Sequence, residues 1–204
     1  TQLGQGHNER YFGPEIGIAD VFSKENKTTY ILKYALGGSC LHTQWLNSHQ
    51  EKGELYKNSI KFFEQKIKYL KNRNVKPHIK GMFWMQGESD SFDPNNPYYE
   101  ENLKTLVEFY RTDLSKYCED HFTFVDAFIS TKTIWWDTNS VNGGKQHVAD
   151  LDPYNFVIKT NGEDETAIDL NIKISSNEGE DAAHYDSVSE VLLGQTAGNI
   201  LKNN

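Results

Sequence analysis

The sequence predicts an α/β protein in which a mostly parallel sheet is covered by helices. The pattern of apolar residues supports this prediction. Short apolar segments rich in β-branched and aromatic residues alternate with longer segments whose apolar residues recur at helical spacing. Strands joined by amphipathic helices imply right-handed crossovers and a sheet with helices on both faces. Because 204 residues suit one domain of this class, we expect a single domain over residues 1–204.

The first strand and the first long helix are expected before residue 80. Residues 30–36 are β-rich and end at Gly37 and Gly38, as a buried strand does where it turns into a loop. Residues 52–73 predict a helix, because apolar side chains recur there on one face: Tyr56, Ile60, Phe63, Ile67 and Leu70. We expect the basic residues of this region to be solvated: Lys61, Lys66, Lys68, Lys71, Arg73, Lys76 and Lys80.

A second round of strand, helix and strand follows. Residues 79–85 form an apolar run bounded by Gly87, which predicts a strand. A turn-rich stretch leads to an amphipathic helix whose apolar face would comprise Leu103, Val107, Tyr110 and Leu114. Residues 121–127 are the third strand candidate.

The C-terminal third begins with a less regular insert. Residues 137–179 are polar and show little periodicity, so we expect a loop-rich segment there. Two stretches within it are apolar enough to predict short strands, at residues 155–158 and 168–174.

The last element is a helix that extends to about Leu201. Ser187 and Glu190 have the spacing of a capping box, in which each side chain satisfies an exposed backbone N–H at the helix start. The apolar face would begin with Val188, Val191 and Leu192.

Composition and charge exclude several classes of function. The net charge of −8 disfavours a nucleic-acid partner, because phosphate backbones reward a basic face. No apolar stretch approaches the ~20 residues that span a bilayer, so we expect no membrane partner. Cys40 and Cys118 match no metal-binding spacing, and no glycine-rich phosphate loop is present. We therefore expect neither a metal nor a cofactor.

Three loops carry polar groups suited to chemistry at the carboxyl ends of the strands. Gly37, Gly38 and Ser39 would expose backbone N–H groups to an anion, although a glycine pair is also a simple tight turn. The segment 84–90 is dense in polar side chains, which fits either a reactive site or a structural hydrogen-bond network. A third loop holds Asp181 and His184, whose spacing suits an acid-base pair as well as two surface residues.

Four motifs together resemble the SGNH (GDSL-like) hydrolases. They are Gly13-Pro-Glu15, Ala35-Leu-Gly-Gly-Ser39, Trp84-Met-Gln-Gly-Glu-Ser-Asp90 and Asp181-Ala-Ala-His184-Tyr-Asp-Ser. The branch of this family that fits best contains the sialate O-acetylesterases and the family 6 carbohydrate esterases, which include acetylxylan esterases. The resemblance extends from residue 13 to about residue 201. It implies a flavodoxin-like three-layer α/β/α sandwich, and removal of acetyl groups from sugars by a Ser-His-Asp triad without a metal.

The resemblance also implies roles for individual residues. His184 would be the general base and Asp181 its orienting partner. The backbone N–H of Gly38 and the side-chain amide of Gln86 would donate to the oxyanion of the tetrahedral intermediate. Ser89 is an alternative to Gln86 in the alignment of this block. The residues expected to support these groups are Glu15, Glu88, Ser89 and Asp90.

One part of the family pattern is missing. The nucleophilic serine belongs to a Gly-Asp-Ser or Gly-Gln-Ser-Asn block that follows the family's first strand and precedes Gly-Pro-Glu, and no such block occurs in the 204 residues. Ser39 and Ser89 fit no nucleophile elbow. We therefore expect an N-terminally truncated esterase without its first strand, inactive as this chain alone. A homologue that has lost catalysis is the alternative.

The expected partner is an acetylated carbohydrate, and action on a polysaccharide would favour a secreted or periplasmic location over a cytoplasmic one. The alternative function is a non-catalytic carbohydrate-binding relative, in which exposed aromatic side chains stack on sugar rings. A flavodoxin-like nucleotide binder is disfavoured by the absent phosphate loop.

Overall fold

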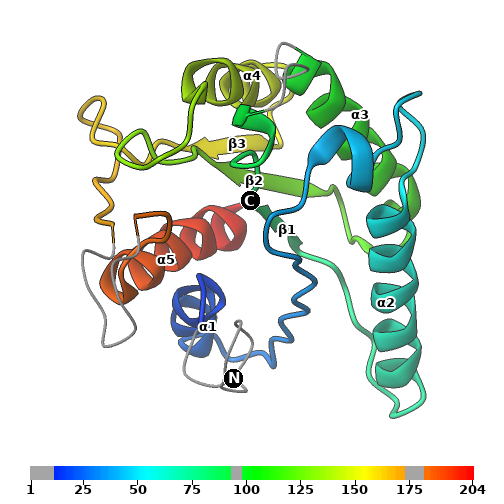
Figure 1. Ribbon diagram of the computed structural model, residues 1–204. Coiled ribbons are helices and arrows are strands. Elements are labelled where there is room, and N and C mark those ends of the chain that lie inside the picture. Colours follow the sequence, from blue (N-terminus) through cyan, green and yellow to red (C-terminus); the bar gives the residue numbers. More distant parts are fainter. Residues whose placement is uncertain (1–11, 93–97, 173–181) are drawn as a thin grey trace. The chain divides into compact units, whose positions relative to one another are not determined.

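The computed structural model describes residues 12–92, 98–172 and 182–204 (Figure 1). The chain forms two compact units. The first unit comprises Thr1–Lys33, Ser130–Trp135 and Ile158–Asn204. The second unit comprises Tyr34–Ile129 and Trp136–Val157. The single domain expected from the sequence stays a prediction.

Within the described residues, the sheet has three strands in the order β1, β2, β3 (Figure 1). Strands β1 (Gly81–Trp84) and β2 (Thr123–Ala127) are parallel, and Phe83 is in register with Val125. Strand β3 (Asn155–Ile158) flanks the other side of β2. Every residue of β2 is buried, as expected for the central strand of a covered sheet. The α/β class and the strands expected over residues 79–85, 121–127 and 155–158 are confirmed.

Helices of the second unit pack against one another and against a short π-helical turn. They are α2 (Glu54–Lys71), α3 (Tyr99–Leu114) and α4 (Thr138–Asp150). The turn, η1 (Leu41–Trp45), contacts both α2 and α3, and α3 packs on α4. A buried hydrogen bond of 2.7 Å between the hydroxyls of Ser59 and Tyr110 links α2 to α3. The described part of this unit also contains the 3₁₀ turns η2 (Asp90–Phe92) and η4 (Ser115–Tyr117).

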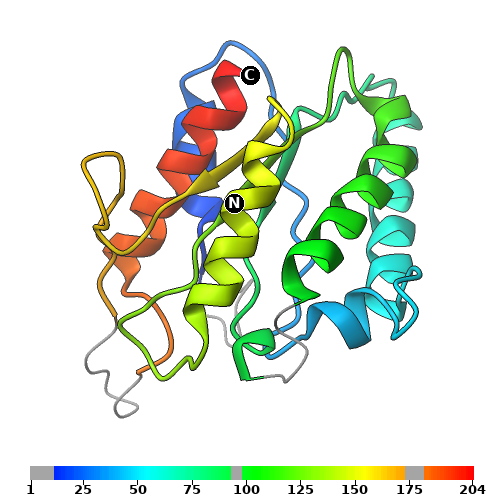
Figure 2. The ribbon, with the colours of Figure 1, turned by 90° about the horizontal axis from the view of Figure 1, so that it is seen from above.

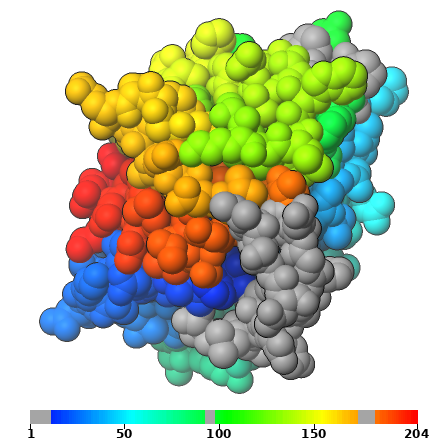
Figure 3. Space-filling view, turned by 60° about the vertical axis from the view of Figure 1, so that its left-hand side comes forward, coloured from blue at the N-terminus to red at the C-terminus, as the bar shows by residue number. Residues whose placement is uncertain are grey.

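The first unit is built on helices α1 (Glu15–Ser23) and α5 (Ser187–Asn203), which lie side by side (Figures 1 and 2). The approach is close because glycines face each other across it. A Cβ on Gly17 would come within 2.6 Å of the backbone nitrogen of Gln195, and one on Gly198 would meet Val21 at 3.1 Å. Figure 3 shows the neighbouring surfaces of α1, in blue, and α5, in red and orange.

Three sequence predictions about elements are wrong. Residues 30–36 form no strand, because no described segment pairs with them and Tyr30 and Leu36 are about half exposed, at 49% and 50%. The insert over 137–179 contains helix α4, whose start is capped by Asp137 accepting from the backbone N–H of Ser140 at 3.1 Å. Residues 168–172 make isolated bridges at Asp169 and Ile172 instead of a strand. Residues 173 and 174 lie outside the described part.

The capping of α5 also differs from the prediction. Asp186, not Ser187, is the N-cap, and its carboxylate accepts from the backbone N–H of Ser189 at 2.7 Å. The buried face comprises Leu193, Ala197 and Leu201, whereas Val188 is 75% exposed and Leu192 is 38% exposed. Both helices expected earlier in the chain are confirmed, and the basic residues around α2 are exposed as predicted.

Among the described residues, no helix combines the length and the apolar character that crossing a bilayer demands.

Candidate functional site

The second unit gathers polar groups in the loop that follows β1. Strand β1 ends at Trp84, and two residues later the buried side chain of Gln86 reaches back to the loop before η1. Its amide nitrogen donates to the backbone carbonyl oxygen of Ser39 at 2.9 Å. The hydroxyl of Ser39 accepts from the indole N–H of Trp45 at 3.0 Å. These bonds hold two of the four family-like motifs together, although their residues lie 47 positions apart.

Asp90 is the acceptor on which this loop cluster depends. The backbone N–H of Leu41 donates to both carboxylate oxygens, at 3.0 Å to Oδ1 and 2.9 Å to Oδ2. The amide of Gln86 donates to Oδ2, and the thiol of Cys40 donates to Oδ1 at 3.3 Å. The buried charge is thus compensated by several donors, which a desolvated carboxylate requires.

Both N–H groups of the Gln86 amide are occupied. One donates to Ser39 and the other to Asp90. Turning the amide over would place its oxygen against the Asp90 carboxylate, so the orientation is chemically fixed. Donation from Gln86 to an oxyanion would therefore require one of these bonds to be released. Its role as an oxyanion donor stays a prediction.

Gly38 has the backbone conformation that a turn presenting N–H groups needs. Its φ of +69° lies in the left-handed region, which glycine adopts without strain, and the residue is exposed. Glu88 and Ser89 are half-buried in the loop after β1, where the backbone oxygen of Glu88 accepts from the Ser91 hydroxyl at 2.7 Å. The structure thus brings Gly38, Gln86, Glu88, Ser89 and Asp90 into one loop cluster of the second unit.

A buried ion pair supports this cluster, and sequence reasoning missed it. Asp126 is in register with Trp84 at the end of β2, and its Oδ1 accepts from Nζ of Lys145 on α4 at 2.7 Å. Burial, joined by the negative charge of Glu88, raises the pKa of Asp126 to about 6 despite Lys145. Nearby, the buried hydroxyl of Tyr99 donates to the backbone oxygen of Gln86 at 2.9 Å. The sequence feature that could have revealed this ion pair is the aspartate near the end of an otherwise apolar strand.

His184 and Glu15 belong to the first unit. His184 is exposed in the segment before α5, next to Tyr185, whose backbone bridges to Ile172. Glu15 is buried at the start of α1, where it accepts from the backbone N–H of Gly13 at 3.1 Å and pairs with Lys33 at 3.0 Å. Asp181 lies outside the described residues, so its predicted pairing with His184 stays a prediction.

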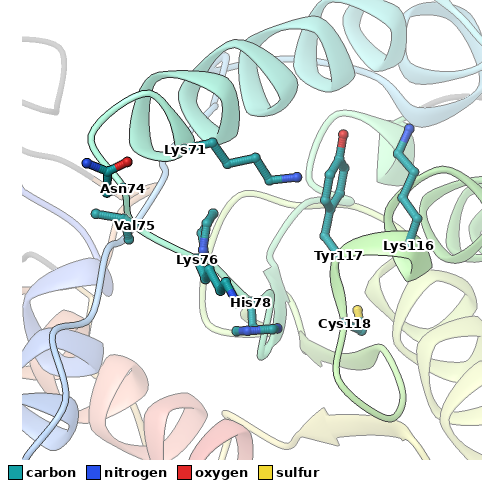
Figure 4. Close-up of a pocket in the computed structure, with 9 residues that line it drawn as sticks. Lys71, Asn74, Val75, Lys76, His78, Lys116, Tyr117 and Cys118 are labelled. Carbon is teal, nitrogen blue, oxygen red and sulfur yellow. The ribbon is translucent and has the colours of Figure 1, made fainter.

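One cavity of the second unit lies away from these residues. It has a volume of about 650 Å³ and is lined by the segments that lead into β1 and β2 (Figure 4). Lys71, Lys76 and His78 come from the first segment and Tyr117 and Cys118 from the second. Because ligands of parallel sheets gather at the carboxyl ends of strands, this cavity at the amino ends is not the candidate active site.

Comparison with known families agrees with the motifs. No curated protein matches the chain. The model of one family, described as carbohydrate esterase, sialic acid-specific acetylesterase, matches residues 4–202. The match includes the loop cluster around Asp90 and supports a general activity of the carbohydrate acetylesterase kind. The chain therefore belongs to the family of sialic acid-specific acetylesterases among the carbohydrate esterases.

Proposed function

We propose that the protein hydrolyses acetyl esters on sugars by a Ser-His-Asp mechanism. The observation that carries the proposal is the loop cluster around Asp90. The family match over residues 4–202 supports it. In this cluster the Gly38 turn is tied to the end of a parallel strand, where acyl-transfer sites of α/β proteins assemble their anion-binding N–H groups.

The proposed reaction has two steps. The nucleophilic serine attacks the acetyl carbonyl while His184 takes its proton, and the sugar hydroxyl leaves with that proton. Water then attacks the acetyl-enzyme while His184 takes a proton from it. The bond between the acetyl carbon and the serine oxygen breaks, the serine regains its proton from His184, and acetate is released. Asp181 would orient the imidazole through its Nδ1–H, and the N–H of Gly38 would stabilise the oxyanion.

The serine itself is not assigned to a described residue. Ser39 is a poor candidate, because its side chain is buried and its hydroxyl already accepts from Trp45. The family pattern instead places the nucleophile in a block that precedes Gly13.

The test is acetate release by the natural full-length protein from O-acetylated sialic acid, acetylated xylan and an aryl acetate. Acetate release that a serine-directed organophosphate abolishes supports the proposal. Binding of the acetylated sugar without acetate release refutes it and favours the non-catalytic alternative, for which Trp136, 80% exposed, offers a stacking surface.

A further inference from the structure

Cys40, His42 and Asp90 bring a sulfur, a nitrogen and an oxygen together within the second unit. The Sγ atom of Cys40 lies 3.2 Å from Nδ1 of His42 and 3.3 Å from Oδ1 of Asp90. The same nitrogen and oxygen are 3.7 Å apart. Thiolate, imidazole and carboxylate are the ligand types that bind Zn²⁺ in proteins. The sequence expectation of no metal came from the spacing of Cys40 and Cys118 and from the family resemblance, and neither considers this arrangement.

The separations fit a tetrahedral ion. Zinc bonds of about 2.3 Å to sulfur and about 2.0–2.1 Å to nitrogen and oxygen place ligand atoms roughly 3.3–3.6 Å apart at tetrahedral angles. The two observed separations from sulfur, 3.2 and 3.3 Å, are a few tenths of an ångström shorter than an ion requires, and the nitrogen–oxygen separation of 3.7 Å is a few tenths longer. Side-chain rotations of this size would complete the site. Three protein ligands leave the fourth tetrahedral position for water or a small anion.

The ligands are held in place by their neighbours. Cys40 precedes the π-helical turn η1, and its backbone N–H donates to Oε1 of Gln44 at 2.7 Å. On Asp90, Oδ2 accepts from the backbone N–H of Leu41 at 2.9 Å and from Gln86. Oδ1 accepts from the same N–H at 3.0 Å and also faces the thiol. Hydrogen bonds of this outer kind orient metal ligands and raise their affinity.

The three side chains are largely buried but not fully excluded from solvent. The side chains of His42 and Asp90 are 15% and 3% exposed, and Cys40 is half-buried. A cation there would compensate the buried carboxylate.

We propose that Cys40, His42 and Asp90 bind one Zn²⁺ ion. Binding displaces the thiol proton to solvent and forms bonds from the thiolate sulfur, Nδ1 of His42 and Oδ1 of Asp90 to the metal. The site does not depend on the proposed esterase reaction, since none of its ligands is assigned a bond-making role there.

The test is zinc binding by the chelator-stripped chain, measured by titration against a competing chelator. We expect one equivalent of Zn²⁺ per chain, and the variants C40A and H42A should each weaken binding by ~100-fold or more, since loss of even an outer partner costs 10–100-fold. The matched controls C118A and H49A remove the other cysteine and an exposed histidine and should keep wild-type affinity. Cobalt in place of zinc should show thiolate-to-metal absorption that C40A abolishes.

Two results would overturn the proposal. One is the absence of stoichiometric Zn²⁺ binding by a chain whose far-ultraviolet circular dichroism is native. The other is binding that C40A and H42A weaken no more than C118A and H49A do. These variants leave Asp90 in place, so the loop cluster it supports stays intact in every comparison.

Discussion

Lys145 and Asp126 form an ion pair with an Nζ to Oδ1 distance of 2.7 Å, and their side chains are 0% and 2% exposed. The pair joins helix α4 to the carboxyl end of β2. Each charge offsets the desolvation of the other, so the pair is balanced only while both members are present. Oδ2 of Asp126 has no hydrogen-bond partner among the described residues, which adds to the cost of an ionised carboxylate there.

Replacing one member of the pair should therefore destabilise the fold strongly. We expect Lys145→Met to lower the free energy of unfolding by about 3–5 kcal/mol, because it leaves a buried carboxylate without its cation. The double variant Lys145→Met/Asp126→Leu should recover most of this loss. Urea unfolding followed by tryptophan fluorescence measures both. Lys159→Met, at an exposed pair with Asp164, is the control and should change little. If Lys145→Met and Lys159→Met lowered the free energy of unfolding by similar amounts, burial of the pair would not be the cause.

The same pair predicts how stability depends on pH. The pKa of Asp126 is raised from 3.8 to about 6 in the folded state, so the folded protein binds this proton more tightly than the unfolded chain. Its contribution is fully present below pH 3.8 and is lost as the pH rises through about 6. The measurement is the unfolding free energy of the wild type minus that of Asp126→Asn across this range. A difference that stays flat or increases with pH would show that the direction is wrong.

The parts of the fold that sequence predicted are those set by local pattern. Helix α2 follows from its regular apolar face, and β2 from the aromatic and β-branched residues of the stretch 121–127. Helix α4 was missed because Gly143 and Gly144 lower helix propensity and only Val141 and Val148 mark its buried side. Tertiary packing favours the helix there, because Gly144 lets α4 approach α3 closely. A Cβ on Gly144 would lie 3.0 Å from the backbone nitrogen of Glu100.

In the candidate site, too, sequence motifs predicted some of the residues, and only tertiary packing reveals the others. The motifs placed Gly38, Gln86 and Asp90 in one site, and the structure joins them through the hydrogen bond from Gln86 to Ser39. No pattern revealed the pairing of Cys40 with Asp90, because those residues are 50 positions apart and meet only when η1 packs beside the loop after β1. The strand expected over 30–36 failed for a related reason, since a strand needs a partner and local β propensity supplies none.

Packing of α1 against α5 predicts opposite effects for two glycine substitutions. Gly17→Ala should destabilise the protein by about 1–3 kcal/mol, because its Cβ would collide with the backbone of α5 near Val191 and Gln195. Gly143→Ala in α4 is the matched control. Its Cβ would meet nothing within 4 Å, so it should stabilise the helix by about 0.5–1 kcal/mol. Thermal unfolding by calorimetry distinguishes the two. Equal effects would mean that the close approach of α1 and α5 is absent in solution.

The proposed reaction predicts that His184 is indispensable and other exposed histidines are not. In the full-length esterase, His184→Ala should lower kcat for an aryl acetate by about 10²–10⁴-fold, because the serine loses its general base. The fold should persist, since His184 is exposed and the adjacent anchor is Tyr185, which is buried. His49→Ala removes a second exposed histidine and should leave kcat unchanged. If His184→Ala keeps more than about a tenth of the wild-type rate, a different residue accepts the proton.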